Sequence, residues 1–168
     1  MTQPDGNAAP LPDPPLRIAP AQLPGDLGVI RALFTAYANG LGVDLRFQGF
    51  EAELADLPGK YAAPQGTILL ARRGDQAVGC IAMRPIGDGT CEMKRLYVAP
   101  AGRGLGLGRR LSDALLDAAR QAGHRRMVLD TLDRLVPAIR LYDGMGFRPI
   151  APYYDNPLPG VVYMGRDL

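Results

Sequence analysis

Glycine and arginine residues cluster in residues 91–111, where a strand-like run passes through a turn into an amphipathic pattern typical of a helix. Gly104, Gly106 and Gly108 lack the Cβ atoms that would hold a ligand away from the backbone. Amides in the first turn of a helix have no partners within it, and the helix dipole adds about half a positive charge there. The stretch therefore predicts a phosphate site, with charge supplied by Arg103, Arg109 and Arg110.

The spacing of the glycines excludes two common phosphate-binding loops. A dinucleotide loop, G-x-G-x-x-G, would need glycine at position 109 or 107, which hold Arg109 and Leu107. A nucleoside triphosphate loop would need G-K-[ST], which does not follow these glycines. The pattern that fits is R-x-x-G-x-G, formed by Arg103, Gly106 and Gly108.

This motif, preceded by a strand-like run at residues 96–98 and a turn at Pro100, resembles the acetyl-CoA pyrophosphate loop of the GNAT acyltransferase superfamily. Residues 138–142, followed by Gly146 and Phe147, resemble the late helix and the following strand of that family, and Tyr142 stands where such enzymes commonly carry a tyrosine. A lone glycine-rich turn can also be a ligand-free connection, but two motifs in the right order argue against that alternative. The resemblance covers about residues 66–168 and is weaker back to residue 16.

The resemblance implies an N-acetyltransferase that takes acetyl-CoA as its co-substrate and needs no metal. The cofactor would contact the strand at residues 96–98 and the turn after it. The residues assigned to the cofactor in this way are Leu96, Tyr97, Val98, Arg103, Gly104, Leu105, Gly106, Leu107, Gly108 and Arg109. The alternative is a non-catalytic module with this fold that senses acyl-CoA or serves in an assembly.

Acetyl transfer to an amine needs a neutral nucleophile and a proton for the departing thiolate. A lysine-like amine has a pKa of ~10.4, so deprotonation and desolvation together must supply about 4–5 kcal/mol. Glu92 is the candidate base, acting through water, and its alternative role is that of a cross-strand partner for a basic residue. Asp130 has the same ambiguity. Tyr142 is the candidate acid, because a phenol is protonated at neutral pH, and its alternative role is packing.

The loop at residues 152–157 places two tyrosines, an aspartate and an asparagine between prolines. We expect Tyr153, Tyr154 and Asp155 to bind the acceptor, a small-molecule or peptide amine. If Asp155 faces the pocket as a counter-charge, a cationic amine is favoured over a carboxylate. The alternative is a turn whose Asx side chains bond their own backbone.

The elements that must position these residues form one domain at residues 16–168, after a flexible proline-rich tail at residues 1–15. An antiparallel meander followed by one parallel crossover predicts an α/β (α+β) fold with a mixed, mostly antiparallel sheet flanked by helices. By resemblance this sheet is GNAT-type and splayed at its centre. Strands are expected at 16–18, 66–72, 77–84, 91–98, 127–131 and 161–166, and helices after Asp26, before Pro58, at 106–121 and from Pro137.

Composition excludes several other classes. The 168 residues are 47% hydrophobic and 21% charged, as in a globular domain, and no apolar run reaches the ~20 residues that span a membrane. The net charge of +2 and the absence of aromatic residues among the basic ones argue against nucleic-acid binding. Cys80 and Cys91 are too few for a disulfide framework, and with no secretory signal we expect a cytoplasmic protein, with homodimerisation left open.

Overall fold

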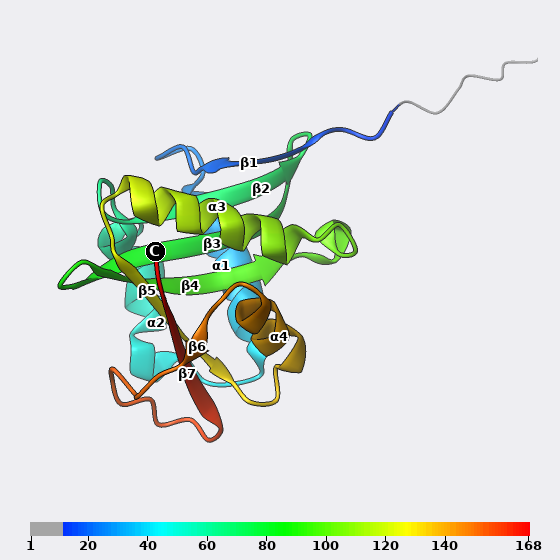
Figure 1. The fold of residues 1–168 in the computed structure, drawn as a ribbon. Coiled ribbons are helices and arrows are strands. Elements are labelled where there is room, and N and C mark those ends of the chain that lie inside the picture. The colour runs from blue at the N-terminus through cyan, green and yellow to red at the C-terminus, as the bar shows by residue number, and fades with distance from the viewer. Residues whose placement is uncertain (1–11) are drawn as a thin grey trace, which may run out of the picture.

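The computed structural model describes residues 12–168 as a seven-stranded sheet with helices on both faces (Figure 1). Residues 1–11 of the predicted tail lie outside the described part. The helices are α1 (Leu27–Leu41), α2 (Phe50–Ala55), α3 (Leu107–Gln121) and α4 (Val136–Gly144), with short 3-10 turns η1 (Arg46–Gln48), η2 (Gly59–Tyr61) and η3 (Pro100–Gly102). The strands are β1 (Leu16–Pro20), β2 (Thr67–Arg73), β3 (Gln76–Gly87), β4 (Thr90–Val98), β5 (Arg126–Leu132), β6 (Arg148–Pro149) and β7 (Val161–Asp167).

The strands follow the order β1-β2-β3-β4-β5-β7-β6 across the sheet. Every neighbouring pair is antiparallel except β4 and β5, which are parallel and are joined through α3. The predicted fold class, a mixed and mostly antiparallel sheet flanked by helices, is confirmed. The short strand β6 comes directly after Phe147, where the resemblance implied a strand following the late helix. Its two residues are both exposed and show no alternation of apolar side chains, so the residue pattern alone did not define it.

Side chains alternate between two apolar cores, one on each face of the sheet. In β2, Ile68 and Leu70 join the core under α1, whereas Leu69 and Ala71 join the core under α3. This period of two is the one expected for a strand with both faces covered. Figure 1 shows α3 crossing one face of the sheet and α1 lying behind the other.

The parallel pairing of β4 and β5 is short. It is limited to Thr90 with Arg126, Cys91 with Met127 and Glu92 with Val128, and beyond these the two strands separate. In the separated half of β4 the register with β3 also shifts, since Ala82 pairs with Lys94 but Cys80 pairs with Tyr97. One extra residue on β4 makes a β-bulge.

Arg95 lies in this bulge with φ of 61°, the left-handed region that a side chain with a Cβ seldom adopts. Its carbonyl oxygen accepts the Cys80 thiol at 3.3 Å. The bulge and the separation of the strands together turn the edge of β4 toward a gap in the middle of the sheet.

Candidate active site

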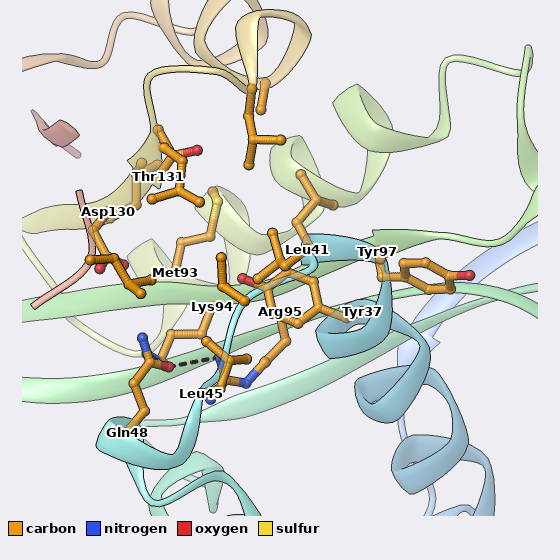
Figure 2. A pocket seen from close by; sticks show the side chains of 18 of the residues that line it. Tyr37, Leu41, Leu45, Gln48, Met93, Lys94, Arg95, Tyr97, Asp130 and Thr131 are labelled. Carbon is orange, nitrogen blue, oxygen red and sulfur yellow. Dashed lines mark hydrogen bonds between the residues drawn. The ribbon is translucent and has the colours of Figure 1, made fainter. Parts of the chain in front are cut away.

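A cavity of about 330 Å³ fills the gap between β4 and β5. Figure 2 shows its wall assembled from separate parts of the chain, with Lys94 and Arg95 from β4, Asp130 and Thr131 from β5, and Tyr37 and Leu41 from α1. The remaining lining residues are Gly40, Val43, Leu45, Gln48, Met93, Leu96, Tyr97, Val98, Arg103, Leu129, Leu132, Leu135, Ala138, Tyr142, Asn156 and Leu158.

One wall of the cavity is the part of β4 that the sequence assigned to a cofactor. Leu96, Tyr97, Val98 and Arg103 all line it. The other assigned residues lie in the turn that follows and in the start of α3, and include Gly104, Leu105, Gly106, Leu107, Gly108 and Arg109. Four of the ten assigned residues therefore line the cavity, and the other six follow them directly in the chain.

The turn before α3 has the form that an anion site requires. Gly106 has φ of 62°, and a Cβ built on it would meet no atom within 4 Å, so the space over it is open. The first hydrogen bond of the helix joins the Arg110 amide to the Gly106 carbonyl oxygen at 3.1 Å. The amides that come before Arg110 in the turn therefore have no acceptor within the helix. Arg109 is exposed and pairs with Asp113, Nε to Oδ2 at 3.0 Å.

Gly102 fixes this turn against the sheet. A Cβ on Gly102 would lie 2.8 Å from the carbonyl oxygen of Val78 in β3, a distance that real side chains do not adopt. This glycine was not singled out from the sequence, because its role depends on a neighbour 24 positions earlier in the chain.

Tyr142 on α4 lines the cavity and is 7% exposed. Its ring packs edge-on against Phe147, with centroids 5.9 Å apart. Burial raises the pKa of the Tyr142 phenol above its ordinary value, so the hydroxyl is protonated at neutral pH. Tyr142 therefore lines the cavity in its protonated form, and it also makes the packing contact that the alternative role implied.

Glu92 lies beside the cavity and is not among its lining residues. Its side chain is fully buried, and it accepts Arg84 Nε at 2.7 Å on Oε1 and the Tyr153 hydroxyl at 2.6 Å on Oε2. Burial raises the pKa of the carboxyl, but the charge of Lys94, the Tyr153 hydrogen bond and Arg84 outweigh it, so the net pKa is lowered. These contacts are those of the cross-strand partner that the sequence left open.

Asp130 is the carboxylate that lines the cavity. Its Oδ2 atom accepts the Tyr154 hydroxyl and also Asn156 Nδ2 at 2.8 Å. Tyr153 and Tyr154, both expected to bind the acceptor, therefore bind the two carboxylates of the site region. Asp155 is exposed and lines a separate shallow depression formed by the loop itself, so the structure does not bring it into the cavity.

The lining residues that the sequence reasoning missed include Gln48, Lys94 and Arg95. Arg95 is 2% exposed, donates to Glu53 through Nε at 2.8 Å and through Nη2 at 3.1 Å, and donates to Gln48 through Nη1 at 3.0 Å. Its guanidinium also lies over the rings of Tyr37 and Phe50. Two adjacent basic residues, Lys94 and Arg95, inside a mostly buried strand were the available signal.

The model of the Acetyltransferase (GNAT) family matches residues 32–147. The chain belongs to the GNAT acetyltransferase family. An uncharacterized N-acetyltransferase of Schizosaccharomyces pombe is 46% identical over 155 residues, covering 91% of this chain and 95% of its own length.

Solved structures agree on the fold of this GNAT enzyme. An acetyltransferase from Streptococcus agalactiae matches with a TM-score of 0.75 and 21% identity over 91% of this chain and 98% of its own. The structure of yncA from Salmonella typhimurium, solved with its cofactor acetyl-CoA, matches with a TM-score of 0.66 and 24% identity over 90% of this chain and 93% of its own. By family the protein is an acyltransferase enzyme that takes acetyl-CoA as co-substrate.

Residues 12–168 are the part of the chain for which metal binding and membrane spanning can be considered. No group of three or more histidine, cysteine, aspartate or glutamate side chains in this part could hold a metal ion. No helix in the same part combines the length and the apolar character needed to cross a bilayer.

Proposed function

We propose that the protein transfers an acetyl group from acetyl-CoA to the primary amine of an acceptor by direct attack, without a covalent enzyme intermediate. One observation carries the proposal. The cavity between β4 and β5 is lined by the end of β4 and by Arg103 ahead of α3, and it is also lined by the charged side chains of Lys94 and Asp130. A donor and an acceptor therefore have separate surfaces in one enclosure.

The donor surface is built from backbone. When bound, acetyl-CoA supplies an activated thioester whose acyl group can pass to an amine. Leu96, Tyr97 and Val98 offer the unpaired edge of β4 to the extended arm of such a molecule, and the turn from Arg103 to the start of α3 offers amides and arginines to its phosphates. The residues present fit the group.

Direct attack is supported by the residues that line the cavity in the described part of the chain. Neither cysteine is among them, and burial raises the pKa of both thiols to about 12. Serine is also absent from the lining, so its hydroxyl groups are tyrosine and threonine. The acceptor nitrogen would form the new bond to the acyl carbon as the carbon–sulfur bond breaks.

Asp130 is our candidate for receiving the acceptor's ammonium group and its proton, because it is the carboxylate on the cavity wall. The positive charges of Lys94 and Arg95 on the facing strand would lower the pKa of an ammonium bound between them. Glu92, the base expected from the sequence, would instead hold Lys94 and Tyr153 in place.

Tyr142 is our candidate acid for the departing thiolate. Its phenol lines the same cavity and is protonated at neutral pH. A positioned general acid contributes about 10²–10⁴-fold to rate, which sets the scale of its test.

The experiment is coenzyme A release from acetyl-CoA, followed with a thiol reagent across a panel of primary amines. We expect release that depends on the amine, and a fall of about 100-fold in kcat for Tyr142→Phe. The matched control is Tyr61→Phe, which removes a buried hydroxyl that donates to Glu53 and lies outside the cavity lining. Tight acetyl-CoA binding with no release for any amine would contradict the proposal and favour an acyl-CoA sensor.

A further inference from the structure

Lys94 is a buried ammonium group on the wall of the cavity. It is 8% exposed and lines the cavity beside Gln48 (Figure 2). Its Nζ lies 3.3 Å from Gln48 Oε1 and 3.6 Å from Glu92 Oε1. An ammonium carries three donors, and both of these contacts are long for a charged hydrogen bond.

Both oxygens that Lys94 approaches already have a closer donor. Gln48 Oε1 accepts Arg95 Nη1 at 3.0 Å, and Glu92 Oε1 accepts Arg84 Nε at 2.7 Å. Lys94 is therefore the second and more distant donor at each oxygen. Burial of a charge this weakly satisfied is unfavourable unless an anion completes the site.

Arg95, the neighbouring cation, does not have this spare capacity. Its guanidinium makes two hydrogen bonds to Glu53 and one to Gln48. It also lies over two aromatic rings. Of the two adjacent cations on β4, Lys94 is the one with donors available to a ligand.

The opposite wall carries a complementary acceptor. The side-chain hydrogen bonds to Asp130 from residues 12–168 both reach Oδ2, from Tyr154 and Asn156. They leave Oδ1 for another donor. The cavity thus has a cation on β4 and a carboxylate oxygen on β5, while apolar side chains close the adjoining wall: Leu41, Val43 and Leu45.

We propose that the acceptor is a free α-amino acid with an apolar side chain, whose carboxylate is bound by Lys94 and whose amino group is received by Asp130. This inference rests on the proposed function. It replaces the expectation of a purely cationic amine, which depended on Asp155 facing the pocket. Lys94 is here a specificity-determining residue, because it binds the part of the acceptor that does not react.

The test compares amines that differ only in the carboxylate. L-Phenylalanine is paired with phenethylamine and L-leucine with 3-methylbutylamine. For each compound kcat/KM for coenzyme A release is measured and expressed per neutral amine, because the α-carboxylate also lowers the pKa of the amino group. A hydrogen bond to a charged group contributes about 1.5–3 kcal/mol, so we expect the amino acid of each pair to be preferred by about 30-fold. In Lys94→Met the preference falls below about 3-fold, and Lys94→Arg restores part of it.

The outcomes separate the two proposals. Equal rates within each pair, or a preference that survives in Lys94→Met, would overturn the assignment of Lys94 and leave acetyl transfer intact. No release with any amine would overturn the proposed function itself. Acetyl-CoA affinity and thermal unfolding, measured for each variant, show that a lost preference does not come from a lost fold.

Discussion

The two sides of the cavity are built in different ways. The proposed donor side comes from one stretch of chain, residues 96–109, and would act through backbone groups at a strand edge and a helix start. The proposed acceptor side is assembled from α1, η1, β4, β5 and the loop before β7, and would act through side chains. A backbone surface is defined by the fold and suits a constant co-substrate, whereas a side-chain surface can change without altering the fold.

The comparison predicts its largest effect on the donor side, at Gly106. Gly106→Asp would put a carboxylate over the helix start, where like charge repels a pyrophosphate, and we expect acetyl-CoA affinity to fall about 1000-fold by calorimetry. Gly123→Asp is the matched control. Gly123 also has positive φ and open space over its Cβ, but lies beyond the other end of α3. Equal losses in the two variants would show that backbone strain, not phosphate binding, is responsible.

On the acceptor side the buried ion pair of Glu53 with Arg95 should dominate stability. Burial alone raises the pKa of Glu53, but Arg95, Lys60 and Tyr61 together lower it to about 2. The folded state therefore binds this proton more weakly than the unfolded chain, so the contribution is complete above pH ~4.5 and is lost as pH falls through about 2.

Glu53→Gln leaves Arg95 buried without its charge partner, so we expect a loss of about 3 kcal/mol in the free energy of unfolding at pH 7. Urea denaturation measures this loss, and Asp44→Asn, which removes an exposed pair with Arg46, is its control. A similar free energy of unfolding for Glu53→Gln and the parent would contradict the structural role of this pair.

Asp130 and Glu92 are the two carboxylates whose roles the comparison can separate. Asp130→Asn removes the carboxylate on the cavity wall, and we expect kcat/KM to fall about 100-fold. Glu92→Gln keeps one oxygen to accept Arg84, and its amide nitrogen can donate to the Tyr153 hydroxyl, so we expect a loss below about tenfold. Thiol release kinetics measure both, and the reverse order of effects would return Glu92 to the role of base.

The smallest expected effect is the pH dependence of the preference for an amino acid over the amine that lacks its carboxylate. Burial lowers the pKa of Lys94 to about 8, against the opposing charge of Glu92. Lys94 is protonated below this pH, so we expect the ratio of kcat/KM between L-leucine and 3-methylbutylamine to fall several-fold between pH 7 and 9. In Glu92→Gln the fall should begin at lower pH, because the negative charge that favours the protonated lysine is gone. A ratio constant with pH would contradict carboxylate binding by Lys94.

The fold, and the glycine-rich turn before α3 that the sequence assigns to the cofactor, could be predicted because their signals are local. Alternating apolar residues in β2 and β3 define strands, and R-x-x-G-x-G defines the turn before α3. The acceptor side could not be predicted in the same way. Lys94 and Gln48 are 46 residues apart, and which face Lys94 occupies depends on the bulge at Arg95.

In the loop before β7, the sequence singled out a segment that lies beside the cavity but did not predict the contacts of its side chains. Tyr153 and Tyr154 do lie at the site, but they donate to Glu92 and Asp130. Asp155, between polar neighbours on both sides, is exposed. Residue types identified the loop, and only three-dimensional packing decides which side chains turn inward.

Because the β4–β5 pairing ends early, the last part of β4 has no protein strand beside it on that side. Three residue pairs join these strands, whereas β5 and β7 pair along seven positions. An extended ligand in the gap would form hydrogen bonds with the backbone of β4, as a neighbouring strand does. Amide hydrogens at Leu96 and Val98 should therefore exchange with solvent faster in the free enzyme than when acetyl-CoA is bound, while amides at Cys91 and Glu92 should exchange slowly in both states.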